Sequence, residues 1–245
     1  MVSFSIDPKP KSQTGDRGVM NDDGKRKAAE RAIGFVTSGQ VVGLGTGSTS
    51  EFAVKALAEM VRQGMLIKGV PTSEASANLA RSLGIPLAEL NDVAHVDITI
   101  DGADEVDPAF NMIKGGGGAL TREKLVALSS RRRVYVVDES KLVERLGQSW
   151  GVPVEVLPFA WTISAQHLGA LGCEPKLRGE PQSPFVTDNE NYIIDCRFNS
   201  ISDAPGLDRA IKQLPGVVES GLFTGIADVL VIGFSDRVEV RERPD

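Results

Sequence analysis

The chain has 245 residues, of which 41% are apolar and 24% are charged, the proportions of an ordinary globular protein. Its net charge of −6 argues against a general basic surface for nucleic acid, and no apolar run approaches the ~20 residues that a membrane helix needs. We therefore expect a cytoplasmic protein that has neither a nucleic-acid partner nor a membrane partner.

The first 21 residues are polar and interrupted by proline, unlike a secretory signal, and we expect residues 1–21 to form a flexible N-terminal tail. The two cysteines, Cys173 and Cys196, lack CxxC spacing, and no histidine is near enough to them in the sequence to suggest a metal site. This favours two reduced thiols and leaves a disulfide between them open.

From residue 22 onward, helical and strand-like segments alternate. The apolar spacing predicts helices over 24–38, 49–63, 74–83 and 120–131, and short strands over 40–45, 66–71, 95–101 and 132–138. Such an alternation is typical of an α/β fold with a parallel sheet and helices on both of its faces.

The pattern changes after Val137. Strands are predicted over 154–160, 173–179, 191–198 and 216–223, with helices over 162–172 and 204–215. This β-α-β-β-α-β order is that of the ferredoxin-like split unit. We expect a smaller α+β domain over 150–220, inserted into a main domain formed by 22–149 and 221–245, to which an apolar strand over 227–234 returns.

Polar clusters follow four of the predicted strands. They are GTGSTS (45–50), TSEAS (72–76), DGADE (101–105) and DESK (138–141). Because the carboxyl ends of parallel strands meet at one edge of a sheet, we expect these clusters to form a ligand site there.

The stretch GLGTGSTS fits neither of the familiar nucleotide motifs. It lacks the last glycine of the dinucleotide fingerprint and the lysine of the P-loop. Its glycines and hydroxyls at a helix start favour binding of a single phosphate through backbone N–H groups. The alternative is an ordinary helix cap made by Ser48 or Thr49.

The acidic stretch DGADEVD has two interpretations, a divalent metal site or a site that holds sugar hydroxyls and moves protons, and its spacing does not decide between them. His95 and His167 lie outside all of the clusters, so we expect no histidine general base.

The stretch KGGGGALTREK, from Lys114 to Lys124, completes a resemblance to a known family. Together with GLGTGSTS, DGADEVD, VVDESK and PGVVESGLF, in this order, it resembles the type A ribose-5-phosphate isomerases over nearly the whole chain, from about Lys25. The resemblance implies a Rossmann-like α/β domain with a smaller α+β domain. It also implies interconversion of D-ribose 5-phosphate and D-ribulose 5-phosphate in the non-oxidative pentose phosphate pathway, without a metal or organic cofactor, by a homo-oligomer (dimer or tetramer).

The resemblance also implies roles for individual residues. Glu123 would be the general base of an enediolate mechanism, Lys114 and Asp104 would hold the enediolate oxygens, and Asp101 would assist ring opening and proton transfer. The phosphate would be held by Thr46, Gly47, Ser48 and Thr49, with charge from Lys25 and Lys141. Further substrate contacts would come from Asp101, Gly102, Ala103, Asp104, Lys114, Gly115, Gly116 and Gly117.

Two other functions remain open at this point. Related α/β domains sense sugar phosphates in transcription regulators, but the polar N-terminal tail cannot form a helix-turn-helix. A CoA-transferase-like enzyme would use a glutamate as nucleophile and would need room for a pantetheine arm, which the sequence does not show.

Overall fold

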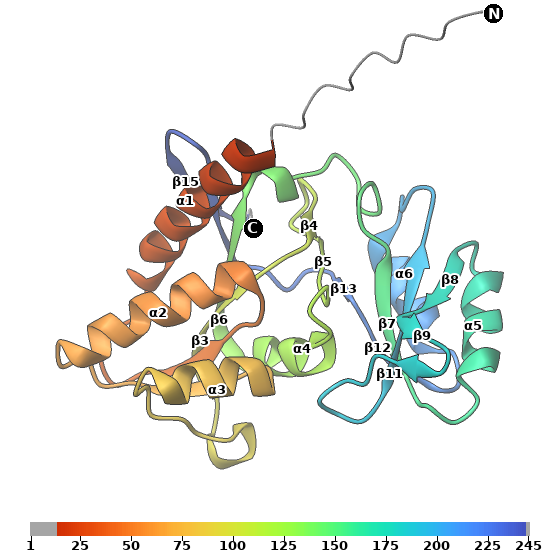
Figure 1. Cartoon of the computed structure of the whole chain (residues 1–245), viewed down its shortest axis with the longest axis horizontal. Helices are drawn as coiled ribbons and strands as arrows, with labels where there is room; N and C mark the ends of the chain where they lie inside the picture. The colour runs from red at the N-terminus through yellow and green to blue at the C-terminus, as the bar shows by residue number, and fades with distance from the viewer. Residues whose placement is uncertain (1–13, 244–245) are drawn as a thin grey trace, which may run out of the picture.

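The protein consists of two sheet-based halves that lie side by side (Figure 1). The structure is a computed structural model that describes residues 14–243, with side chains from residue 22 onward. Residues 1–13 of the predicted tail lie outside this range, whereas residues 14–21 form the first turns of helix α1 (Thr14–Ile33). Every helix within the described range is too short or too polar to cross a membrane.

The larger sheet has six strands in the order β15-β14-β6-β3-β1-β2. Strands β1, β2, β3, β6 and β14 are parallel, and β15 adds an antiparallel edge. The bounds are β1 Val41–Leu44, β2 Lys68–Pro71, β3 Val96–Gly102, β6 Ser130–Asp138, β14 Val229–Gly233 and β15 Val238–Glu242. The helices connected with this sheet are α1, α2 Ser48–Arg62, α3 Glu74–Ser82 and α4 Leu120–Leu128, and they confirm the predicted α/β class.

The alternation of side chains along β6 shows how the two faces are covered. Val134 and Val136 join the core beneath α1 and α2, whereas Tyr135 and Val137 belong to the core on the opposite face, on the side of α4. Asp101 is in register with Tyr135 and therefore projects from β3 toward the α4 side.

The second sheet is antiparallel throughout, in the order β12-β7-β11-β8. Its strands are β7 Val152–Val156, β8 Glu174–Leu177, β11 Tyr192–Arg197 and β12 Val217–Ser220, and its helices are α5 Trp161–Ala170 and α6 Ala204–Lys212. This is the predicted ferredoxin-like arrangement. It has a core of its own, in which Val154, Ile194 and Ile211 are fully buried.

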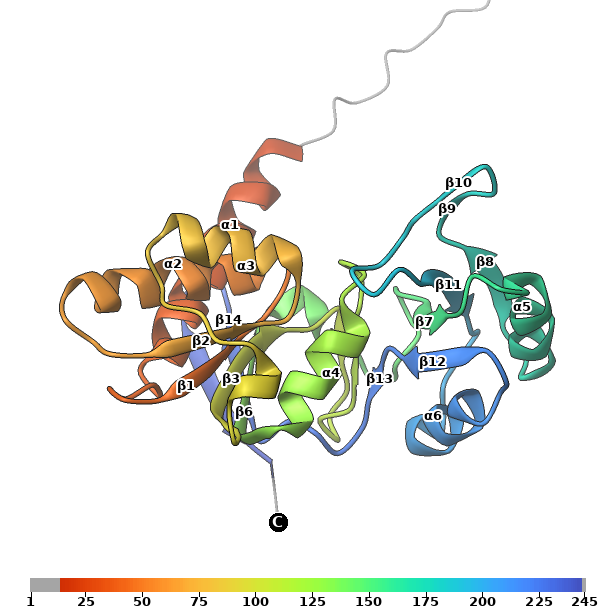
Figure 2. The same ribbon diagram turned by 90° about the horizontal axis from the view of Figure 1, so that it is seen from below.

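Several short elements lie in and between these sheets. Strands β4 Glu105–Val106, β5 Met112–Ile113 and β13 Leu222–Phe223 form a three-stranded sheet, and β9 Gly179–Glu180 pairs with β10 Ser183–Pro184. Two 3-10 helices, η1 Leu90–Asp92 and η2 Glu139–Lys141, complete the chain. Figure 2 shows β13 leading from β12 toward the larger half.

Several elements differ from the sequence-based expectation. The first helix, predicted over 24–38, runs from Thr14 to Ile33. The strand predicted over 216–223 is broken at Gly221, because β12 pairs in the second sheet and β13 in the three-stranded sheet. The helix predicted through residue 131 ends at Leu128, because Ser130 already pairs with Val96 in the larger sheet. The edge strand β15 and the two-residue strands β4, β5, β9 and β10 were not predicted from the sequence.

Candidate active site

The loop before α2 leaves backbone donors free at the helix start. Gly47 occupies the N-cap position with a φ of 99°, and no side chain of the described residues caps the helix. The structure therefore does not show the alternative in which Ser48 or Thr49 caps it. The first N–H groups of a helix have no partner within the helix. Lys25 reaches this point from α1, with its Nζ 3.4 Å from Ser48 Oγ. Backbone donors, hydroxyls and a cation therefore converge at one place.

The TSEAS cluster forms hydrogen bonds with Thr46 of this loop. The Thr46 hydroxyl lies 2.7 Å from that of Thr72 and donates to Ser73 Oγ at 2.8 Å. Thr72 in turn donates to the carbonyl of Leu44 at the end of β1. These contacts hold Thr46 in place.

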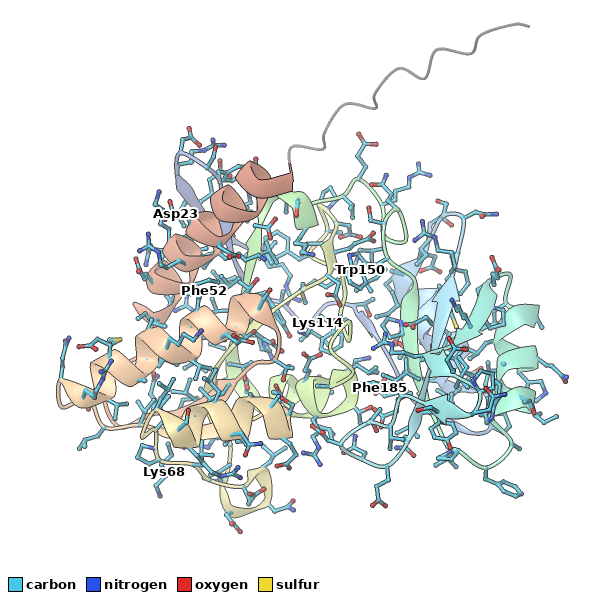
Figure 3. The ribbon with its side chains drawn as sticks, in the orientation of Figure 1. Asp23, Phe52, Lys68, Lys114, Trp150 and Phe185 are labelled. Carbon is cyan, nitrogen blue, oxygen red and sulfur yellow. The ribbon has the colours of Figure 1, made fainter. Side chains whose placement is uncertain are left out.

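A cleft opens at the carboxyl edge of the larger sheet, and it collects most of the predicted site residues. Its lining consists of Thr46, Gly47, Ser48, Thr49, Gly102, Ala103, Asp104, Lys114, Gly115, Gly116, Gly117, Glu123 and Lys141. Two predicted residues lie just outside the lining: Lys25, which contacts Ser48, and Asp101, which lies next to Lys114. Figure 3 labels Lys114 near the middle of the molecule, between the two halves.

Lys114 lies between two buried carboxylates. Its Nζ is 3.0 Å from Asp101 Oδ2 and 3.3 Å from Glu123 Oε1, and it donates to the carbonyl of Gly102 at 2.6 Å. Lys114, Asp101 and Glu123 are each less than 5% exposed to solvent. Asp101 is held further by the Ser50 hydroxyl and by the N–H of Gly102, at 3.1 and 2.7 Å from Oδ1. The Lys114 ammonium thus interacts with two carboxylates in a site that is shielded from solvent.

The burial of this cluster changes how its members ionise. Burial raises the pKa of Glu123 to about 8, and the attraction of Lys114 offsets this only in part because Asp101 and Asp104 add repulsion. Burial by itself lowers the pKa of Lys114, but the attraction of Asp101 and Glu123 outweighs it and the net pKa is raised. Lys114 therefore stays charged, whereas Glu123 can take up or release a proton near neutral pH.

One oxygen of Glu123 remains available. Oε2 is buried and has no hydrogen-bond partner among the described residues. Glu123 lies in the first turn of α4, where its own N–H donates to the carbonyl of Ala119, and its side chain lines the cleft. A buried carboxylate oxygen without a partner in the lining of a cleft can accept a proton from a ligand.

The four glycines form a tight segment beside the acids. Gly115 and Gly118 have φ values of 97° and 84°, a conformation that residues with a side chain rarely adopt. The N–H of Gly116 donates to Asp104 Oδ2 at 2.7 Å. The N–H of Lys114 donates to the carbonyl of Gly221 at 2.9 Å, which anchors the segment to the break between β12 and β13.

The sequence-based prediction missed two residues that contact the site. Ser50 holds Asp101, and it belonged to the GTGSTS cluster, so its hydroxyl was a usable signal. Arg178, from the second sheet, donates to the carbonyls of Gly115 and Gly116. No sequence pattern connects Arg178 with a segment more than 60 residues away.

Comparisons with known proteins agree with these motifs. The family model of "Ribose 5-phosphate isomerase A (phosphoriboisomerase A)" matches residues 68–237. The ribose-5-phosphate isomerase A of Parvibaculum lavamentivorans is 50% identical over 228 residues, which cover 90% of this chain and 98% of that protein. The enzyme of the same name from Thermosynechococcus vestitus is 51% identical, with 87% of this chain and 94% of that protein covered.

Solved structures give the same result for the fold. A D-ribose-5-phosphate isomerase in complex with phospho-erythronic acid superposes with a TM-score of 0.88 at 40% identity, covering 91% of this chain and 99% of that chain. Ribose 5-phosphate isomerase A of Methanocaldococcus jannaschii gives a TM-score of 0.86 at 40% identity, covering 90% of this chain and 99% of that chain. The chain therefore belongs to the ribose 5-phosphate isomerase A family of enzymes.

Proposed function

We propose that this isomerase interconverts D-ribose 5-phosphate and D-ribulose 5-phosphate through an enediolate, with Glu123 as the general base. The observation that carries the proposal is the Glu123 carboxylate in the cleft lining, 3.3 Å from the buried Lys114 and with its other oxygen unpartnered. Membership in the isomerase family favours this function over a sugar-phosphate sensor or a CoA-transferase.

The reaction moves two protons and leaves the atoms of the sugar unchanged in number. Ionised Glu123 removes the proton from C2 of the open-chain aldose, the C2 electrons form the C1–C2 double bond, and the aldehyde oxygen O1 becomes an oxyanion. Glu123 then returns its proton to C1, and the proton on O2 passes to O1, which gives the ketose. Asp101 would assist ring opening and this second transfer.

The role that we assign to Lys114 follows from charge balance. Before the reaction Lys114 lies beside the negative charges of Asp101 and Glu123, and after proton removal the charge of Glu123 has moved to the substrate oxygen. Lys114 can therefore stabilise the new oxyanion as Glu123 becomes neutral, with no large movement and in a place from which water is largely excluded. Asp104, which lines the cleft and holds the Gly116 N–H, would contact the other enediolate oxygen.

The phosphate group would bind at the start of α2. The free N–H groups there and the hydroxyls of Ser48 and Thr49 suit an anion, and Lys25 and Lys141 supply positive charge nearby. The related enzyme in complex with phospho-erythronic acid carries a phosphorylated sugar acid, which supports a sugar phosphate as the ligand of this cleft as well.

The function is tested by incubating the purified chain with D-ribose 5-phosphate and measuring the ketose formed, with and without EDTA. We expect turnover that EDTA does not change, because no group of three or more His, Cys, Asp or Glu residues among the described ones is arranged to hold a metal ion. Absence of ketose would contradict the function. Turnover that EDTA abolishes and added divalent metal restores would contradict the metal-free mechanism.

Thr49→Ala should weaken substrate binding more than it slows turnover. The change removes one hydrogen bond to a charged group, worth about 1.5–3 kcal/mol, so we expect KM to rise about 10- to 100-fold. Steady-state kinetics with Thr49→Ser as the control, which keeps the hydroxyl, measures the effect. A fall in kcat with KM unchanged would place Thr49 near the reacting carbons and away from the phosphate.

The value of kcat/KM should rise with pH until about pH 8. Burial raises the pKa of Glu123 to about that value, and only the ionised carboxylate can remove a proton. Below it, kcat/KM should fall by about tenfold per pH unit, since kcat/KM reports the ionisation of the free enzyme. A profile that is flat between pH 6.5 and pH 9 would mean that the base titrates elsewhere.

Three expectations from the sequence remain proposals. They are the cytoplasmic location, the assembly into a dimer or tetramer, and the division into a main domain and a smaller domain over 150–220. Sedimentation velocity of the purified chain tests the assembly, and expression of residues 150–220 alone tests whether the smaller domain folds independently.

A further inference from the structure

Arg178 connects the second sheet with the glycine segment of the cleft. It follows β8, and its Nη1 donates to the carbonyl oxygens of Gly115 at 2.9 Å and Gly116 at 3.1 Å. The rest of its guanidinium forms a bidentate pair with Asp195 of β11, with Nε 2.9 Å and Nη2 2.5 Å from the carboxylate oxygens. Asp195 thus orients the guanidinium, and Nη1 is left to hold the glycine carbonyls.

These two contacts determine the direction of the peptide groups. No peptide bond in the described chain is cis, and in a trans peptide the C=O and N–H groups point in opposite directions. The Gly115 carbonyl points to Arg178, and the N–H of the same peptide, that of Gly116, donates to Asp104 on the other side. The Gly116 carbonyl likewise points to Arg178, which turns the N–H of Gly117 away from it.

The N–H of Gly117 therefore has a fixed direction and is free to donate to a ligand. Gly117 lines the cleft, and its N–H has no hydrogen-bond acceptor among the described residues. Glycine backbone is otherwise the most mobile kind, and a donor stabilises a developing oxyanion best when it is held in place beforehand.

Phe185 also packs against the glycine segment. Arg178 and Phe185 flank the hairpin formed by β9 and β10. The N–H of Phe185 donates to the carbonyl of Arg178 at 2.9 Å, and the guanidinium of Arg178 lies 5.7 Å from the Phe185 ring. A Cβ atom at Gly118 would overlap that ring, so Phe185 packs directly on the glycine segment. Figure 3 labels Phe185 on the side of the second sheet that faces the larger half.

We propose that Arg178 is a positioning residue for the isomerisation. By holding the carbonyls of Gly115 and Gly116, it keeps the N–H of Gly117 directed at the reacting oxygens of the sugar. The inference rests on the proposed function of the cleft and adds to it a specific contribution of the second sheet: that sheet orders the backbone donors of an active site otherwise built from the larger half.

The first test is Arg178→Lys. A lysine ammonium cannot form the fork with Asp195 and reach two carbonyls as well. A misplacement of about 1 Å at a reacting group can cost about 10²-fold, so we expect kcat to fall about 10- to 100-fold with little change in KM. The matched control is Arg133→Lys. Arg133 forms a similarly buried bidentate pair with Asp228, but it lies in the amino-terminal half of β6 and contacts none of the glycine carbonyls. It should retain the parental kcat.

The second test does not depend on activity. Amide hydrogen exchange of residues 114–118, followed by NMR without substrate, should show lost protection of the Gly116 N–H in Arg178→Lys and unchanged protection in Arg133→Lys.

A third test measures the recovery of turnover. Free guanidinium ion should restore part of the kcat of Arg178→Ala, whereas an equal concentration of NaCl should not. A folding defect would give no such rescue.

Four outcomes would overturn the proposal: a parental kcat in Arg178→Lys, an equal loss in the Arg133→Lys control, a loss confined to KM, or unchanged exchange at Gly116. If the unsubstituted chain forms no ketose, the proposed function itself is wrong. In that case the catalytic role of Arg178 falls with it, and the exchange data separately report whether Arg178 orders the glycine segment.

Discussion

Glu123→Gln should lose nearly all turnover while it still binds the substrate. The amide has the size of the carboxylate and can form hydrogen bonds, but it cannot take the proton from C2. General-base catalysis contributes about 10²- to 10⁴-fold, and we expect kcat to fall by at least that factor with KM changed little. Steady-state kinetics, with isothermal titration for substrate affinity, gives both quantities.

The control for Glu123→Gln separates catalysis from helix stabilisation. Any carboxylate in the first turn of a helix interacts favourably with the helix dipole. Glu51 has the same position in α2 but is exposed, so Glu51→Gln should show the loss of that interaction without a loss of turnover. Parental turnover in a folded Glu123→Gln variant would make another residue the base, with Asp101 as the next candidate.

Thermal stability gives a further check on Glu123. Its pKa is raised from 4.5 to about 8 in the folded chain, so the folded state holds a proton that the unfolded state loses between these values. The stability that this proton supplies is present below pH 4.5 and is lost as the pH rises through about 8. Relative to the parent, Glu123→Gln should therefore gain stability over that interval.

Lys114→Met should have an effect of similar size on turnover and a larger one on folding. It removes the cation that we assign to the enediolate oxyanion, and loss of one such group typically costs about 10²- to 10³-fold in kcat. It also leaves Asp101 and Glu123 buried without a counter-ion, and breaking a buried ion pair costs about 3–5 kcal/mol. Without the attraction of Lys114, the pKa of Glu123 rises further, so the rise of kcat/KM should move to higher pH.

A double variant keeps this prediction testable if Lys114→Met does not fold. Lys114→Met with Asp101→Asn removes one cation and one anion, so that of the three buried groups Lys114, Asp101 and Glu123 only Glu123 can still carry a charge. We expect a higher melting temperature than for Lys114→Met and a turnover still about 10²-fold or more below that of Asp101→Asn alone. Equal turnover in these two variants would mean that Lys114 does not stabilise the transition state.

The α/β class, the ferredoxin-like order of the second sheet and most of the residues that line the cleft could be predicted from the sequence alone. This was possible because these features depend on local patterns. Residues that follow parallel strands meet at one edge of the sheet, so Thr49, Asp104 and Lys141 could be grouped before any contact was known. The glycine segment next to Lys114 was visible for the same reason, since four consecutive glycines are a local signal.

The ionisation of these residues and their contacts with distant parts of the chain depend on the three-dimensional packing. The elevated pKa of Glu123 depends on its burial, on its 3.3 Å distance to Lys114 and on the charge of Asp101, and these three residues come from different segments of the chain. The strand breaks at Gly221 because the residues before it pair with β7 and the residues after it pair with β5, in a different sheet. The contact of Arg178 with the glycine carbonyls depends on how the two halves pack, because the charge and length of an arginine do not specify the backbone that it meets more than 60 residues away.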